Sequence, residues 1–160
     1  SNTDVRNIFV ASSTITNPAD FRRYTTRKFK FNFGSDVPLI RTAEMILIDA
    51  EALARTPGKE AEAHDLLYAL QKNRDANAVK STNTGAALID EILLERRKEL
   101  YAENGVEWFD AKRLRKGITR TGNHRIFKNL SADDKRFFLK VPQREIDANE
   151  SIDDTVNKDR

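Results

Sequence analysis

The chain has 160 residues, enough for one domain with its own apolar core. Net charge is +3, and the balance of hydrophobic (39%) and charged (33%) residues is not that of a disordered segment. Cysteine is absent, which excludes disulfides, thiolate catalysis and cysteine-ligated zinc. No stretch approaches the roughly 20 apolar residues that a membrane-spanning helix needs.

Residues 1–37 are predicted to form an irregular or extended lead-in. Residues 1–26 are rich in Ser, Thr, Asn and Arg and show no sustained period. Residues 28–33 read Lys-Phe-Lys-Phe-Asn-Phe, a strict alternation that predicts a half-buried strand ending at Gly34.

Residues 38–55 are predicted to form the first helix, with Pro38 in its first turn. One face of this helix is apolar and comprises Leu39, Ala43, Ile46, Ala50 and Leu53. Met45, Ile48 and Ala52 lie on the opposite side. A helix that is apolar on two sides is expected to pack between neighbours.

A second helix is predicted to follow at once, capped by Thr56 and opened by Pro57. Its apolar face comprises Ala63, Leu66, Leu67 and Leu70, and the pattern fades near residues 74–77. Two helices joined by so short a turn must be antiparallel. Such a hairpin resembles one unit of a TPR-like solenoid, but no second copy follows at a period of about 34 residues.

Residues 86–103 are predicted to form a third helix, which Asn104 and Gly105 close. Its apolar face comprises Ile89, Ile92, Leu93 and Leu100. Arg96 projects from that face, and an unpaired buried guanidinium would cost several kcal/mol. We therefore expect a buried, multiply hydrogen-bonded Arg96. Its candidate partners are carboxylates of the first and third helices, namely Glu44, Glu51, Glu99 and Glu103.

The remaining residues are predicted to hold few regular elements. Residues 106–116 carry Trp108 and Phe109 on a segment that we expect to be wedged into the core, and residues 117–128 read as a loop. Residues 137–141 are predicted to be extended, Pro142 opens a helical turn over 143–148, and the tail after Asn149 is expected to fray. The predicted fold is mostly α, with a TPR-like helical hairpin, further packed helices, a short strand and long loops.

Four sequence blocks, taken in order, resemble the C-terminal region of the SusD/RagB family. They are residues 38–52, 93–100, 105–113 and 141–149, the last reading Val-Pro-Gln-Arg-Glu-Ile-Asp-Ala-Asn. The residues that match the family motifs are Arg41, Glu44, Glu51, Glu95, Arg96, Arg97, Glu99, Trp108, Phe109, Asp110, Pro142 and Glu145. On this resemblance, residues 38–149 are expected to form the C-terminal helical domain of a longer parent protein, followed by a polar tail at 150–160.

The resemblance implies a function. Proteins of this family are lipid-anchored on the outer face of the outer membrane, bind glycans or other nutrients, and cover a SusC-like TonB-dependent transporter. They are not enzymes. The expected partners are therefore a nutrient and the transporter, with no nucleic acid, cofactor or metal, and with a lipid anchor outside this chain. The alternative is a helical-repeat interaction module that contacts the transporter and has no ligand site of its own.

Residues with possible chemistry have simpler structural interpretations. Glu95 and Glu99, four residues apart among basic residues, favour ion pairing along the helix over hydrolysis, for which two carboxylates must flank a cleft. His64 and His124 belong to no metal-ligand or nucleophile pattern. The basic block at 111–128 lacks interleaved aromatics and favours a solvated surface over nucleic acid.

Three aromatic side chains are weak candidates for ligand binding, since aromatic faces suit apolar sugar surfaces. Trp108 is more consistent with a core position. Tyr24 and His124 are expected to be more exposed.

Overall fold

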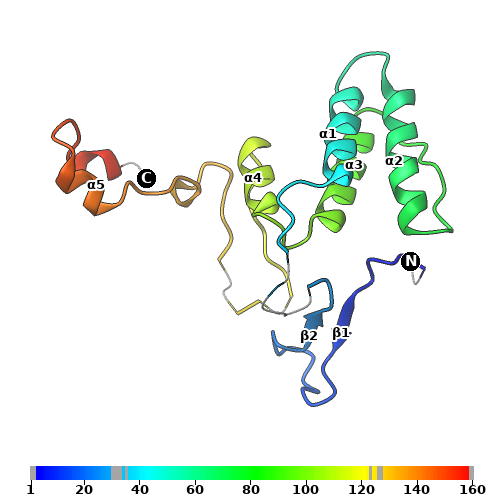
Figure 1. Cartoon of the computed structure of the whole chain (residues 1–160), viewed down its shortest axis with the longest axis horizontal. Coiled ribbons are helices and arrows are strands. Elements are labelled where there is room, and N and C mark those ends of the chain that lie inside the picture. Colours follow the sequence, from blue (N-terminus) through cyan, green and yellow to red (C-terminus); the bar gives the residue numbers. More distant parts are fainter. Residues whose placement is uncertain (1–2, 30–33, 35, 123, 126–127, 159–160) are drawn as a thin grey trace. The chain divides into compact units, whose positions relative to one another are not determined.

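A computed structural model of the chain describes residues 3–29, 34, 36–122, 124–125 and 128–158. The chain divides into two compact units, Ser1–Glu107 (unit 1) and Trp108–Arg160 (unit 2). As predicted, the fold is mostly helical with a short antiparallel sheet. The elements are β1 (Phe9–Ala11), β2 (Tyr24–Thr26), α1 (Thr42–Ala54), α2 (Glu60–Arg74), α3 (Gly85–Glu99), α4 (Val106–Arg113), the 3-10 turn η1 (Lys135–Phe137), α5 (Gln143–Ala148) and the 3-10 turn η2 (Asp154–Asn157) (Figure 1).

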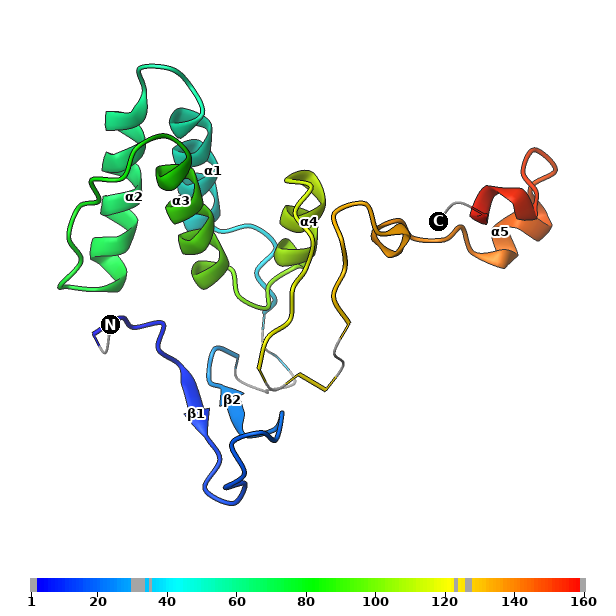
Figure 2. The same ribbon diagram turned by 180° about the vertical axis from the view of Figure 1, so that it is seen from behind.

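Helices α1, α2 and α3 lie side by side in unit 1, as both views show (Figures 1 and 2). The turn between α1 and α2 makes them antiparallel, as predicted. Arg96, near the end of α3, contacts Glu44 at the start of α1, so α3 also runs antiparallel to α1. Their shared core comprises Ala43, Leu47, Ala50, Ala54, Ala63, Leu67, Leu70, Leu88 and Ile92.

Helix α1 begins at Thr42, four residues later than the pattern predicts. Arg41 is extended (φ −129°, ψ 146°) and uses its side chain in ion pairs. Leu39 is 77% exposed, so its predicted place on the buried face is wrong. Met45 and Ile48 are also exposed, because α2 and α3 both pack on the other side of α1.

The turn between α1 and α2 has a different cap from the predicted one. The Thr56 hydroxyl donates to the Ala52 carbonyl at 2.9 Å, so Thr56 closes α1 and does not cap α2. Gly58 has a φ of +78°, a conformation that favours glycine, and α2 begins two residues later at Glu60. The predicted apolar face of α2 is confirmed, with Ala63, Leu67 and Leu70 buried and Leu66 packed against the core.

The lead-in contains a strand pair that the sequence pattern does not reveal. β1 and β2 are antiparallel, with Phe9 opposite Thr26 and Ala11 opposite Tyr24. Each has three residues, too few for an alternation to be recognised. Residues 30–33 of the predicted strand lie outside the described residues, and Lys28 and Phe29 form a bend after β2.

In unit 2, the burial of Trp108 and Phe109 differs from the prediction. Trp108 is half-buried and packs on Phe137, with ring centroids 4.7 Å apart and the planes tilted by 44°. Phe109 is 62% exposed, so the expectation that this residue is wedged into the core is wrong. In an eight-residue helix with one side packed, adjacent residues 108 and 109 point about 100° apart, and only one of them can face the packed side.

The end of unit 2 is more ordered than its polar sequence suggests. Helix α5 occupies the predicted residues, and η2 follows it. The Asn157 side chain pairs with both the N–H and the carbonyl of Val141, at 2.9 Å each, and so anchors the tail. The predicted fraying after Asn149 is therefore wrong for the described residues, 149–158.

The burial of residues in unit 1 predicts that two leucine-to-alanine variants differ strongly in stability. Leu67 is fully buried and Leu39 is exposed. We expect Leu67→Ala to lower the free energy of unfolding by about 2–5 kcal/mol, because it removes buried methyl groups and leaves a cavity. Leu39→Ala should change it by no more than about 0.5 kcal/mol. Urea titration of both variants measures the difference, and equal effects would contradict the packing.

Trp108 is the single tryptophan of the chain, so its fluorescence reports on the packing of unit 2. We expect Phe137→Ala to shift Trp108 fluorescence to the red, because Phe137 is 2% exposed and packs on the indole. Phe138→Ala is the matched control, since Phe138 is half exposed and should leave the emission unchanged. An unchanged spectrum in Phe137→Ala would show that this contact is not formed in solution.

Candidate functional site

Three buried carboxylates lie on one face at the end of α3 and just beyond it. Glu95, Glu99 and Glu103 are spaced four residues apart and each is at least 93% shielded from solvent. Buried carboxylates need compensating charges. The cations come from four separate segments of unit 1 and are Arg6, Lys28, Arg41 and Arg74.

Glu99 is the centre of this cluster. Arg74 donates to its two oxygens from Nε and Nη2, at 3.0 and 2.9 Å, and Arg41 donates from Nη1 at 2.8 Å. Arg6 adds a longer contact of 3.3 Å. Arg41 also holds Glu103 with two bonds of 2.9 Å, the bidentate geometry that suits a guanidinium. The start of α1, the end of α2 and the lead-in therefore meet at one carboxylate.

Lys28 completes the cluster from the segment after β2. Its ammonium group contacts the Glu103 carboxylate at 2.5 Å and donates to the carbonyls of Glu99 and Tyr101 at 3.0 and 2.7 Å. These carbonyls are at the end of α3, where helical carbonyls lack partners and a cation is favourable. Lys28 therefore serves as a charged cap for α3.

The cluster keeps Glu99 ionised. Burial alone would raise its pKa, but the hydrogen bonds and charges of Arg74 and Arg41 outweigh burial and lower the pKa from 4.5 to about 2. A carboxylate with so low a pKa holds no proton near neutral pH and is a poor general acid or base. Glu95 and Glu99 therefore form ion pairs, but mostly with cations of other segments, and among the described contacts only the 3.4 Å contact of Glu95 with Lys98 lies along the helix as predicted.

The structure confirms the expected burial of Arg96 and identifies Glu44 as one of its partners. Arg96 is 7% exposed, and Nη2 donates to Glu44 at 3.0 Å. Glu51, the other candidate on α1, is buried and pairs with Arg55 one turn later. Arg96 and Glu44 tie α3 to α1 within the helical core.

The remaining motif residues have local roles. Asp110 pairs with Arg113 one turn along α4 at 2.7 Å. Pro142 precedes the first turn of α5, and the exposed Glu145 accepts from Asn149 at 3.3 Å. Within the described residues, these contacts are structural.

A groove of about 540 Å³ lies beside the cluster, between the lead-in and α3. The described residues that line it are Asp4, Arg6, Asn7, Phe9, Leu94, Arg97, Lys98 and Tyr101. One wall is the face of α3 that carries Leu94, Arg97 and Lys98, and Tyr101 in the turn after the helix continues it. The other wall is the segment that leads into β1.

The groove combines aromatic and polar groups. Phe9 and Tyr101 form an edge-to-face pair with ring centroids 5.1 Å apart, and both remain partly exposed. Leu94 is half exposed beside them. Apolar faces with a few polar groups at the edge are typical of ligand sites.

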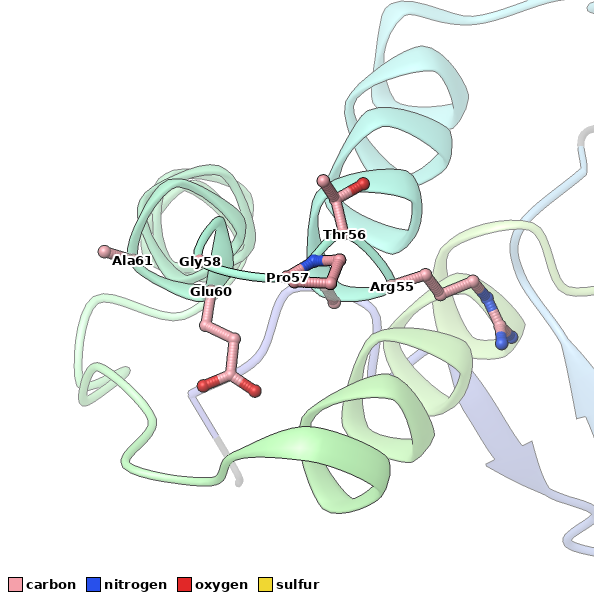
Figure 3. Close-up of a pocket in the computed structure, with 7 residues that line it drawn as sticks. Arg55, Thr56, Pro57, Gly58, Glu60 and Ala61 are labelled. Atoms are coloured by element: carbon pink, nitrogen blue, oxygen red, sulfur yellow. The ribbon is translucent and has the colours of Figure 1, made fainter.

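A second hollow, of about 460 Å³, surrounds the turn between α1 and α2 (Figure 3). Arg55 and Glu60 point in different directions from this turn, so their charged groups do not converge (Figure 3). Glu60 accepts from the Gly85 N–H at 2.7 Å and thereby caps α3. This hollow has no aromatic lining residue among those described, and we interpret it as a structural turn.

The three aromatic candidates from the sequence are not among the described lining residues of the groove. Tyr24 is exposed on β2, Trp108 packs on Phe137 in unit 2, and His124 is exposed in a loop of unit 2. The helical spacing of residues 94, 97, 98 and 101 is visible in the sequence and is the one signal that indicates a wall of the groove. No pattern in the sequence indicates that residues 4–9 form the other wall.

The described part of the chain holds neither a cluster of metal ligands nor a membrane-spanning helix. None of its His, Asp and Glu side chains gather in a group of three or more that could hold a metal ion. Its helices are all too short or too polar to cross a bilayer.

The ion pairs of Glu99 predict the cost of removing its charge. We expect Glu99→Gln to cost about 3–5 kcal/mol of stability, because Arg41 and Arg74 would lose the carboxylate that compensates them. Glu62→Gln is the matched control, since Glu62 is exposed and pairs only with Lys59 in the described contacts. Its cost should stay below about 1 kcal/mol. Urea titration of both variants checks the contrast.

The low pKa of Glu99 also predicts a pH dependence. A carboxylate with a depressed folded-state pKa stabilises the fold above its unfolded pKa of 4.5, and this contribution is lost as the pH falls toward about 2. At about 1.4 kcal/mol per pKa unit, the loss is on the order of 3 kcal/mol. Thermal unfolding between pH 5 and about 2 should show a smaller decline in Glu99→Gln. Parallel curves for the two proteins would contradict the assignment.

Comparison with known proteins gives one match. No curated protein and no solved structure is significantly similar to the chain. The model of the SusD family, however, matches residues 20–157, which span both units and all four motif blocks. At the level of the family, these are nutrient-binding proteins that act with SusC-like transporters and are generally associated with the outer membrane. Because the match covers most of its length, this chain belongs to the SusD family.

Proposed function

We propose that this chain is a non-catalytic component of an outer-membrane TonB-dependent uptake system and captures a glycan for a SusC-like transporter. The match to the SusD family over residues 20–157 is the observation that carries this proposal. The parent protein would be held on the outer face of the membrane by a lipid anchor. Capture would be non-covalent.

Within the described residues, the groove of unit 1 suits a sugar best. Phe9 and Tyr101 offer apolar ring surfaces, and Asn7 offers an amide at the same site. Sugar rings present apolar C–H faces and hydroxyl edges, which these two kinds of group complement. The volume of about 540 Å³ falls in the range of small-molecule pockets and would hold a short oligosaccharide segment.

A pair of tyrosine variants tests the proposal. We expect Tyr101→Ala to weaken glycan binding roughly fivefold, because loss of an aromatic contact costs about 1 kcal/mol. Tyr24→Ala is the control, since Tyr24 is exposed on β2 and is not among the described lining residues. Calorimetric titration against a panel of oligosaccharides measures both. Loss of binding only in Tyr24→Ala would move the site to β2, and binding of no glycan would refute capture.

One observation favours the alternative of a module that contacts the transporter. Met45 and Ile48 form an exposed apolar strip on α1, facing away from α2 and α3. Exposed apolar strips on helices are frequent at protein interfaces. Under this alternative, Ile48→Asp should abolish co-purification with the SusC-like transporter and leave glycan titrations unchanged. Transporter binding without any glycan binding would favour this alternative over glycan capture.

A further inference from the structure

We infer that the groove of unit 1 selects an acidic glycan, one that carries carboxylate or sulfate groups, and this inference rests on the proposed function. The described lining holds three cations, Arg6, Arg97 and Lys98, against a single carboxylate, Asp4. The excess is positive, although the buried cluster beside the groove is rich in carboxylates. The ion pairs that each of these side chains already makes determine which charges can still bind a ligand.

Asp4 is already compensated. Arg6 holds both of its oxygens, with Nε at 2.9 Å from one and Nη2 at 2.7 Å from the other, and the Arg6 N–H donates to the first at 2.8 Å. These hydrogen bonds from Arg6 lower the pKa of Asp4 despite its partial burial. Arg6 is in turn directed at Glu95 and Glu99. This group of charges is thus closed on itself and neither attracts nor repels a ligand strongly.

Arg97 and Lys98 are used much less. Arg97 is 67% exposed and makes a solvent-exposed pair with Glu107 at 2.8 Å. Lys98 is half exposed, and its contact with the buried Glu95 is long, at 3.4 Å. Exposed pairs of this kind contribute at most about 1 kcal/mol and exchange readily for another anion. Guanidinium and ammonium donors therefore remain available at the groove.

Tyr101 and the two cations line the groove from α3 and the turn after it, and Phe9 faces them from β1. Leu94, Arg97 and Lys98 on α3 and Tyr101 in the turn that follows place an apolar surface and two positive groups close together along the chain. A sugar packed on Phe9 and Tyr101 would have its substituents near Arg97 and Lys98. A neutral sugar uses the aromatic rings and the Asn7 amide but not the two cations. A uronic acid or a sulfated sugar uses the cations as well, and a planar guanidinium suits either anion.

The test compares three probes of similar length with the full chain: an oligogalacturonide, a sulfated oligosaccharide and a neutral malto-oligosaccharide. We expect calorimetric titration to show tighter binding of at least one acidic probe than of the neutral one. This preference should fade as salt rises, since the screening length falls from about 10 Å at 0.1 M to about 3 Å at 1 M. The two acidic probes distinguish a carboxylate source from a sulfate source.

Two double variants separate the groove from general electrostatics. Arg97→Gln with Lys98→Gln should weaken the acidic probe about tenfold and leave the neutral probe unchanged, because two local charge contacts are lost. Arg22→Gln with Lys59→Gln is the control, with the same change in net charge. Arg22 is 64% exposed and Lys59 is half exposed, and neither is among the described lining residues. This control should retain the acidic preference.

The outcomes separate this inference from the proposed function. Equal binding of neutral and acidic probes overturns the acidic preference and leaves glycan capture intact. Equal loss in both double variants also overturns it, since the effect would then come from net charge. Failure of every probe to bind defeats glycan capture itself. Thermal unfolding of each variant shows that loss of binding is not loss of fold.

Discussion

The Glu99 carboxylate is the interaction on which unit 1 depends. It sits at the end of α3 and receives hydrogen bonds from the residue that precedes α1 and from the last residue of α2, with a third cation from the lead-in. Its pKa falls to about 2 despite burial, which shows that these partners more than offset desolvation. The apolar core sets how closely the helices pack, while this cluster fixes which of their ends come together. Removing one buried charge is costly because its partners stay behind.

The residues of α3 divide into groups with different roles. Leu88 and Ile92 fill the core, and Glu95 and Glu99 bind the cations. The face that carries Leu94, Arg97 and Lys98 lines a groove together with Tyr101 from the turn that follows. The motif Glu-Arg-Arg-Lys-Glu at 95–99 therefore supplies buried anions, one buried cation at Arg96 and two exposed cations. Its neighbouring arginines differ in burial because adjacent helical positions point about 100° apart.

The same segments that build the cluster also line the groove. Arg6 pairs with the buried carboxylates and lines the groove, and Phe9 three residues later supplies an aromatic wall. A ligand held there would rest on a wall whose backbone is fixed by ion pairs. Pre-organisation of this kind lowers the entropic cost of binding, since the wall need not be ordered by the ligand. This lower entropic cost is a physical reason for a binding protein to keep a cluster of buried charges that is costly to desolvate.

The sequence by itself determined the helices and the family. The apolar period located α1, α2 and α3, Pro142 marked the start of α5, and the placement of Arg96 on an apolar face required a buried partner. These are local properties, readable from spacing and from the cost of burying a charge. The predicted end of the third helix at Asn104 and Gly105 is wrong, because α3 ends at Glu99. Only the tertiary structure decided that Glu44 is that partner, that Phe109 is exposed while Trp108 packs on Phe137, and that residues 4–9 face α3 across a groove. Such contacts join residues up to about 90 positions apart, and a single sequence carries no periodic signal that pairs them.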